Sequence, residues 1–228
     1  MLNDLGSRRI EVAEVIAALR SAGLGGAPDG LPTPRDADLE VLDGRPAGPG
    51  LRHSAVLIAL FDDDHGAHVV LTRRSDQLRN HRGEVSFPGG RIDGGEGVVG
   101  AALREALEEV ALQPDLVEVA AHLHPIVTLA SGSLIAPVVG TLAGRPSLVA
   151  APAEVERVFD VALTDLLVEG VFHEERWRRP ERPSPRSTDG SFPLWFFEIS
   201  GEMIWGATGR LLVDLLCLTL GVELAPEP

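Results

Sequence analysis

Three glutamates stand close together in a segment with helical character. Glu105, Glu108 and Glu109 occupy positions i, i+3 and i+4 within residues 98–110, so all three project from one face of a helix. Like charges at this spacing destabilise a helix by roughly 0.2–0.5 kcal/mol, which a bound cation would offset. Mg²⁺ takes carboxylate oxygens together with substrate phosphate oxygens. The simpler alternative is a solvated acidic face on which Arg104 and Glu108 form an ordinary ion pair.

The segment before the glutamates favours metal binding over a solvated face. A loop rich in glycine leads directly into the helix, and several residue types recur at set intervals. In chain order these are Gly90, Glu96, Arg104, Glu105, Glu108 and Glu109. Five residues separate the first two and seven separate the second from the third. This spacing resembles the Nudix box, a motif long enough to make a chance match very rare.

One position departs from the box. Ala111 stands where the box normally has glycine. Glycine suits a left-handed residue at a helix end, where alanine costs on the order of 1 kcal/mol. The substitution affects helix termination and none of the carboxylates, so we expect activity to survive it.

Residues 71–90 carry a second resemblance. A Leu-Thr pair, an Arg-Ser pair, a later arginine, a glycine and Phe-Pro-Gly-Gly follow one another as in the coenzyme A pyrophosphatase branch of the Nudix family. Weaker similarity extends the resemblance over roughly residues 52–220. It implies hydrolysis of coenzyme A, including acyl or oxidised forms, to 3′,5′-ADP and 4′-phosphopantetheine.

Two other functions stay open. One is a Nudix pyrophosphatase acting on ADP-ribose or another nucleoside diphosphate derivative, and the upstream signature argues against it. The other is a non-catalytic nucleotide-sensing module that keeps the fold. The intact set of three glutamates argues against a sensor, which has no need of a metal site.

The family resemblance implies roles for the residues that match the motif. Glu105 and Glu109 are the first metal ligands, for Mg²⁺ or Mn²⁺, with Glu108 and the carbonyl of Gly89 as further ones. Arg104 orients the carboxylates and pairs with Glu96 from the outer shell. The residues expected to bind the pyrophosphate or the 3′-phosphate of the substrate are Arg74, Arg79, His81 and Arg82. Arg73 and Arg91 add to this basic region. Each arginine has the alternative role of balancing nearby acids.

The general base has two principal candidates. Glu108 lies on the predicted helix beside the metal ligands. Glu154 lies in a loop before a predicted strand, where chain mobility could bring it over the substrate. Glu156 is a third candidate. His122 and His124 alternate along a predicted strand, and a structural role is the more common one for such histidines.

The elements that must position these residues follow from hydrophobic spacing. Helices are predicted at residues 9–24, 98–110 and 205–220. Strands are predicted at residues 55–61, 68–71, 116–127, 134–142, 155–163 and 194–199, the first two as a hairpin. Residues 25–50 and 176–190 are predicted to be an arm and a mobile loop. The pattern predicts an α/β fold, and the resemblance implies the Nudix α/β/α sandwich with a mixed β-sheet. The expected division is residues 1–50, a helix and Gly/Pro-rich arm, and residues 51–228, the hydrolase domain.

Composition narrows the class of partner. The 228 residues have a formal net charge of −14, which disfavours binding to nucleic acid or to an anionic membrane. No secretory signal or membrane-spanning stretch is visible. The single Cys217 excludes an intrachain disulfide. We therefore expect a cytoplasmic protein with a small nucleotide substrate, and a homodimer is left open.

Overall fold

The fold is built around a hairpin of two long strands. The computed structural model describes residues 8–28, 52–78, 81–128, 132–178 and 191–222. Strand β1 (Arg52–Asp63) pairs antiparallel with β2 (Gly66–Arg74), as predicted. On its other side β1 lies parallel to β7 (Ser133–Thr141), so the sheet is mixed. Residues 57–61 of β1 are fully buried, which explains their uninterrupted apolar run.

Shorter strands complete this sheet on both sides of the hairpin. Within the described residues the sheet has eight strands, with the order β3-β2-β1-β7-β5, and with β4, β6 and β8 attached to β1, β7 and β2. The shorter strands are β3 (Val85–Ser86), β4 (Gly89–Arg91), β5 (Glu118–His122), β6 (Ile126–Thr128) and β8 (Val155–Ala162).

The strand predicted at residues 116–127 is broken in the structure. The chain makes a short 3₁₀ turn at Pro114–Leu116, then β5, and then β6 after a gap. The gap contains Pro125, which has no backbone N–H to give to a sheet. A single strand across this region was therefore the wrong prediction.

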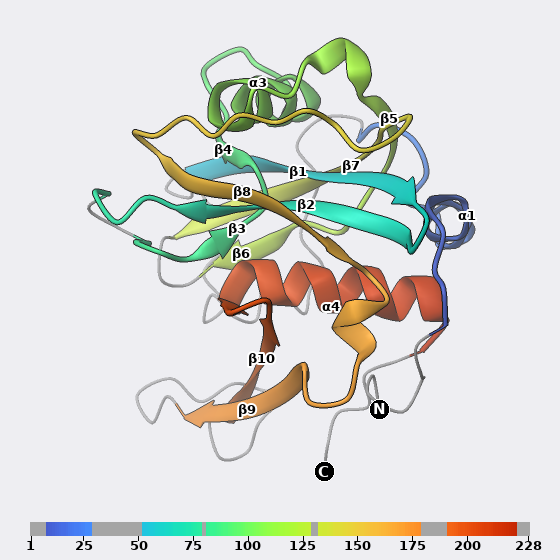
Figure 1. Cartoon of the computed structure of the whole chain (residues 1–228). Coiled ribbons are helices and arrows are strands. Elements are labelled where there is room, and N and C mark those ends of the chain that lie inside the picture. Colours follow the sequence, from blue (N-terminus) through green and yellow to red (C-terminus); the bar gives the residue numbers. More distant parts are fainter. Residues whose placement is uncertain (1–7, 29–51, 79–80, 129–131, 179–190, 223–228) are drawn as a thin grey trace.

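Helices cover both faces of the main sheet. Figure 1 shows α3 (Val98–Val110) on one face and α4 (Gly206–Leu220) on the other, with α1 (Val12–Ser21) beside one end of α4. Each face has its own apolar core, and the residues of α1 share the core of α4. This arrangement is the predicted α/β/α sandwich. No helix in the described part of the chain is long and apolar enough to cross a membrane.

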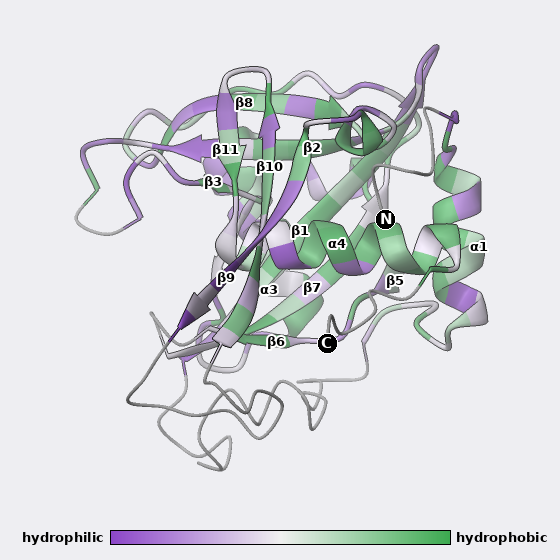
Figure 2. Ribbon diagram, turned by 90° about the horizontal axis from the view of Figure 1, so that it is seen from below, coloured by the Kyte–Doolittle hydropathy of each residue, from purple (hydrophilic) through white to green (hydrophobic). Residues whose placement is uncertain are grey.

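A second, three-stranded sheet packs against α4. It consists of β9 (Phe172–Arg178), β10 (Ser191–Ile199) and β11 (Glu202–Ile204), in the order β11-β10-β9. Its inner face buries Phe197 and Ile204 in the core shared with α4. Figure 2, which views the molecule from below, shows this sheet in front of α4. Strands β9 and β11 were not predicted, and residues 176–178, assigned to a mobile loop, form the end of β9. Residues 179–190 of that predicted loop, and residues 29–50 of the predicted arm, lie outside the described part of the chain.

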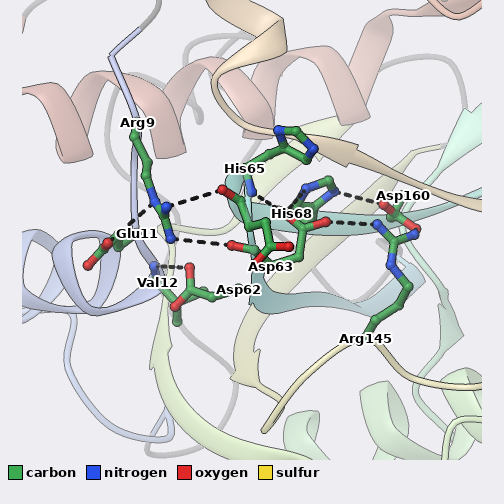
Figure 3. Close-up of polar contacts among 10 residues, drawn as sticks. Arg9, Glu11, Val12, Asp62, Asp63, His65, His68, Arg145 and Asp160 are labelled. Carbon is green, nitrogen blue, oxygen red and sulfur yellow. Dashed lines mark hydrogen bonds and ion pairs between the residues drawn. The ribbon is translucent and has the colours of Figure 1, made fainter.

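The turn of the central hairpin holds the N-terminal segment. Asp62 Oδ1 accepts a hydrogen bond of 2.9 Å from the backbone N–H of Val12, the first residue of α1. The guanidinium of Arg9 donates to the carbonyls of Asp63 and Asp64 (Figure 3). The side chain of Glu11, which precedes α1, makes no capping hydrogen bond, so Asp62 of the hairpin caps the helix instead.

An ion-pair cluster ties the same end of the hairpin to β8. His68 lies between two carboxylates: Nδ1 is 2.8 Å from Asp160 Oδ2, and Nε2 is 2.9 Å from Asp63 Oδ1. Arg145 pairs with both aspartates (Figure 3), and its guanidinium lies over the ring of Phe61. Because these side chains come from β1, β2, β8 and a connecting loop, the cluster fixes the strands relative to one another.

Helix α3 ends as the sequence predicts. Ala111 adopts the left-handed conformation, with φ of 57°, and its backbone N–H donates to the carbonyl of Leu107. Leu112 follows and is buried, so the strained turn directs an apolar side chain into the core.

Replacing Ala111 with glycine should raise the free energy of unfolding by about 1 kcal/mol, because glycine adopts positive φ without steric cost. Urea unfolding followed by circular dichroism measures the change. Ala17→Gly is the matched control, since Ala17 is exposed within right-handed α1 and glycine there should cost about 1 kcal/mol. Shifts of the same sign in both variants would contradict the explanation.

Candidate active site

Two glycines, where the connection from β3 enters β4, let the chain approach the C-terminal half of α3, and this segment is called the glycine loop. Gly89 and Gly90 pair with Val56 and Ala55 of β1. A Cβ atom on Gly89 would lie 2.4 Å from the carbonyl oxygen of Ala55, and one on Gly90 would lie 2.5 Å from the carboxyl carbon of Glu105. Any side chain at either position would therefore displace backbone or carboxylate.

Glu109 is the most buried carboxylate of the site, with 3% of its side chain exposed. Its Oε2 accepts a hydrogen bond of 3.0 Å from the backbone N–H of Gly89, and its Oε1 is 3.6 Å from Arg74 Nη1. Burial raises the pKa of Glu109 to about 7, against the lowering effects of Gly89 and Arg74 and with the charges of Glu105 and Glu154 adding to the rise. An added cation would relieve this cost.

Glu105 faces the same loop from one turn earlier. Burial raises the pKa of its carboxyl, the neighbouring Arg104 lowers it, and the charges of Glu108 and Glu154 raise it further. The charge of Glu154 thus lies near enough to raise the pKa of both Glu105 and Glu109, and the charge of Glu105 raises that of Glu109 as well. Such mutual repulsion is typical of a site built to hold a cation.

Glu108 differs from the other two helix glutamates. Its side chain is 58% exposed and its Oε2 accepts a hydrogen bond of 3.0 Å from Arg104. We expected one face to carry all three carboxylates, but the structure divides them. Glu105 and Glu109 contact the glycine loop, whereas Glu108 lies at the solvent edge, since one residue of rotation separates it from Glu109.

Arg104 makes the predicted pairing with Glu96. Its guanidinium donates to both carboxylate oxygens of Glu96, to Glu105 and to the carbonyl of Arg91. The hydrogen bonds to Glu96 are the main cause of the rise in the pKa of Arg104. Arg104 therefore links the loop, the helix and Glu105, which fits the outer role predicted for it.

The loop that carries Glu154 is attached to the end of α3. The backbone N–H groups of Val149 and Ala151 donate to the carbonyls of Val110 and Glu109, and the carbonyl of Glu154 accepts from Ser75. We expected motion to bring Glu154 to the site, but its charge already acts on Glu105 and Glu109 in this conformation. Its side chain is exposed to solvent.

Two adjacent arginines of β2 have different partners. Successive side chains of a strand point to opposite faces, so Arg73 and Arg74 of β2 point apart, and the register with β8 shifts beside them. Arg73 pairs with Glu156 and with the buried Glu202 of β11, so it is a structural residue. Arg74 approaches Glu109, and its buried Nε has no hydrogen-bond partner within the described residues.

The remaining predicted substrate residues lie in the connection from β2 to β3. Arg82 Nε donates to the carbonyl of Leu78 over 2.6 Å, and His81 Nδ1 lies 2.8 Å from Glu84 Oε2. Arg79 lies outside the described residues. Arg91 is exposed at the end of β4.

The histidine and glutamate alternatives have structural partners. His122 Nδ1 lies 3.2 Å from the carbonyl of Gly26, next to the end of α1. This contact belongs to the packing of α1 on β5, and His124 follows β5 in the connection to β6. Glu156 is engaged by Arg73. These contacts favour the structural alternative for His122 and show Glu156 held in an ion pair with Arg73.

The residues of the site fit a hard divalent cation. In the ranges that the structure describes, no three His, Cys, Asp or Glu side chains converge on one point. Glu105 and Glu109 nevertheless offer oxygen donors beside a backbone cradle that a Cβ on Gly90 would fill. Mg²⁺ typically uses one or two carboxylates and takes its other ligands from water and phosphate, so two such side chains suffice. The carbonyl of Gly89 and the side chain of Glu108 stay predicted ligands.

Comparison with known proteins identifies the domain. The family model of the NUDIX domain matches residues 51–182 of the chain. The chain is 32% identical over 172 residues to Nudix hydrolase 3 of Caenorhabditis elegans, covering 72% of this chain and 72% of that protein. It is 35% identical over 174 residues to the Nudix hydrolase NudL of Citrobacter koseri, covering 75% of this chain and 84% of that protein.

Solved structures share only a general likeness with the chain. A complex of the Caenorhabditis elegans Ap4A hydrolase is 18% identical, with a TM-score of 0.45, and the match covers 50% of this chain and 82% of that one. The NUDIX domain of Shewanella oneidensis NrtR, solved with ADP ribose, is 20% identical, with a TM-score of 0.42, and the match covers 58% of this chain and 86% of that one. Neither score is high enough to transfer a ligand.

The buried carboxyl of Glu109 predicts an unusual dependence of stability on pH in the absence of divalent ions. Its pKa is about 7 in the folded protein, against an ordinary value of 4.5, so the folded state holds the proton more tightly. The free energy of unfolding should therefore lose this contribution as the pH rises from about 4.5 to about 7. Urea unfolding in EDTA across this range, with Glu109→Gln for comparison, measures the effect. The glutamine variant stays neutral and should gain stability relative to the unmodified protein as the pH rises. Glu108→Gln, at the exposed position, is the control, and parallel pH profiles for all three proteins would refute the prediction.

Proposed function

Because the chain belongs to the Nudix family of hydrolases, we propose that it cleaves the pyrophosphate bond of coenzyme A or of its acyl or oxidised forms. The products from coenzyme A are 3′,5′-ADP and 4′-phosphopantetheine. The choice of coenzyme A as substrate rests on the resemblance of residues 71–90 to the coenzyme A pyrophosphatase signature. The contact of Arg74, an arginine of that signature, with Glu109 supports it, because it links the signature to the site.

The role of the acidic residues follows from the charge of the substrate. A pyrophosphate is a polyanion, and its attack by water is opposed by negative charge. Glu105 and Glu109 would hold a divalent cation, with Glu108 and the carbonyl of Gly89 as further ligands, and that cation would supply charge neutralisation and a lower pKa for an attacking water. Arg104 keeps Glu105 in place through the bridge to Glu96.

The general base is assigned to Glu154 over Glu108. Glu154 lies within electrostatic reach of both Glu105 and Glu109 and has a solvent-exposed side chain. Glu108 is occupied by the ion pair with Arg104 and stands further round the helix. A carboxylate that is free to accept a proton from water suits the base better than one already paired.

Binding of the substrate phosphates is assigned to residues 74–82, the basic loop. Arg74 has a buried Nε without a partner within the described residues, and it lies beside the carboxylates. His81 and Arg82 lie in the connection between β2 and β3, and Arg79 belongs to the same segment. One guanidinium group can donate two parallel hydrogen bonds to two oxygens of the same phosphate, which suits both the pyrophosphate and a 3′-phosphate.

A substrate panel with Mg²⁺ or Mn²⁺, analysed by mass spectrometry, tests the proposal. Coenzyme A should be a better substrate than dephospho-coenzyme A, and Arg82→Ala should reduce this difference. Loss of a charge-assisted hydrogen bond costs roughly 1.5–3 kcal/mol, so kcat/KM for coenzyme A should fall at least about tenfold. Arg20→Ala, on the exposed side of α1, is the control. Equal use of both substrates would remove the 3′-phosphate site. Preference for ADP-ribose would identify another Nudix specificity, and no turnover of any substrate would favour a sensor.

Three glutamine variants separate the general base from the metal ligands. Glu154→Gln should lower kcat about 10²–10⁴-fold with an unchanged Mg²⁺ titration, because it removes a base and no ligand. Glu109→Gln should lower activity and raise the Mg²⁺ concentration needed for half-activity. Glu156→Gln is the matched control two residues from the proposed base and should leave kcat near normal. Near-normal kcat in Glu154→Gln would move the role to Glu108, to be tested by Glu108→Gln.

A further inference from the structure

The outer face of the three-stranded sheet is apolar and aromatic. Alternation along β9 and β10 places one set of side chains toward α4 and the other away from it. Register pairs Phe192 with Trp177, and Phe196 with His173, on the outer face. The outer residues that carry the argument are His173, Trp177, Phe196, Met203 and Trp205.

These aromatic rings form a stacked row with exposed ends. The rings of His173 and Phe196 are stacked with centroids 5.1 Å apart, and those of Phe196 and Trp205 are stacked at 6.0 Å. Trp177 lies tilted against Trp205 at 6.3 Å. Trp177 is 45% exposed, Met203 42% and Trp205 36%. Large apolar side chains grouped on a surface in this way mark a binding surface more often than scattered ones do.

The charges on this face select the kind of ligand. Glu175 and Glu198 flank His173 at 3.8 and 3.9 Å, and among the described residues of the three strands the arginines point to the other face. The indole N–H of Trp177 donates to Glu175, so its ring offers only apolar contact. A phosphate would be repelled by these carboxylates, whereas an uncharged chain would not.

The three-stranded sheet and the start of α4 contact β3, which leads to the active site. Trp205 immediately precedes α4, and in the first turn of that helix Thr208 Oγ1 donates to the carbonyl of Val85 over 2.9 Å. Val85 begins the segment that leads to Gly89, four residues later. Figure 2 shows β11 beside β3, and Glu202 of β11 also pairs with Arg73 of β2. The basic loop and the three-stranded sheet that carries the aromatic face therefore adjoin the same edge of the main sheet.

We propose that the aromatic face, made by the exposed side chains of Trp177, Met203 and Trp205 around the buried ring of Phe196, binds the uncharged end of the substrate, namely the pantetheine arm and its acyl chain. This inference rests on the proposed function. Coenzyme A has a phosphate-bearing half and an uncharged half, and the two surfaces divide in the same way: arginines before β3 receive the phosphates, and the aromatic face receives the arm. The enzyme thereby prefers acylated over free coenzyme A.

Binding of an arm without phosphates tests the inference directly. S-octanoyl-pantetheine, titrated into the full chain, should quench tryptophan fluorescence saturably. The double variant Trp177→Thr/Met203→Thr should weaken binding at least about tenfold, since each lost side chain removes apolar contact. Because Trp177 itself contributes to the fluorescence, isothermal titration calorimetry should be used to confirm the same loss of affinity. Leu116→Thr, an exposed leucine in the 3₁₀ turn after α3, is the control and should bind as the unmodified protein does. Absence of binding to the unmodified protein would overturn the inference.

Kinetics distinguish failure of the inference from failure of the proposed function. The ratio of kcat/KM for octanoyl-coenzyme A to that for coenzyme A should fall about tenfold in the double variant and stay constant in Leu116→Thr. Hydrolysis of coenzyme A with an unchanged ratio would overturn the inference alone. Loss of dimers in the variant, with an unchanged ratio, would also overturn it and assign the face to a second copy of the chain. Saturable binding of S-octanoyl-pantetheine without coenzyme A turnover would reject the proposed function and keep the apolar ligand site. The single variant Trp177→Thr, at the exposed edge strand, replaces the double variant if the latter unfolds.

Discussion

The contact between a glycine loop and a buried carboxylate organises the site. Glu109 is held almost out of solvent by the backbone of Gly89, with Arg74 as the nearest cation in the described structure. Burying a carboxylate costs free energy unless a partner offsets it. The fold must therefore bring together three parts: helix α3, which carries Glu109, strand β1, which pairs with the glycine loop, and Arg74. The strained helix end at Ala111 serves the same demand, because it turns the chain away immediately after the ligand helix.

The local parts of the fold were accessible from sequence because local chemistry determines them. The limits of α3 follow from its apolar spacing and from the left-handed residue that ends it, and both match the structure. The hairpin follows from a turn between two apolar runs. The small sheet was incompletely predicted because β9 has the sequence FHEERWR. Its charged residues are uncommon in strands, and most of them are exposed, so no buried apolar pattern indicates the strand. Its partners lie beyond residue 190, so only tertiary pairing reveals it.

The sequence indicated candidate residues for the site but not the directions in which their side chains point. Sequence placed Glu105, Glu108 and Glu109 on a common face, but the approach of the glycine loop from one side separates Glu108 from the others. Likewise, nothing in the run of two arginines distinguishes Arg73 from Arg74. Their places in the folded sheet do, since alternation along β2 directs one toward Glu202 of the small sheet and the other toward Glu109.

The cap of α1 has a consequence for the order of folding. The side chain that receives the first N–H of this helix, Asp62, is 50 residues away, and the carbonyl of Ile10 meets the N–H of Ala67 still later in the chain. A helix of ten residues is marginal by itself in water. The segment that leaves the ribosome early must therefore wait for the hairpin before it gains a cap, and for α4 before its apolar face is covered. Nascent chains that lack α4 leave that face uncovered, so a chaperone has most to shield in the period before residues 206–220 are synthesised.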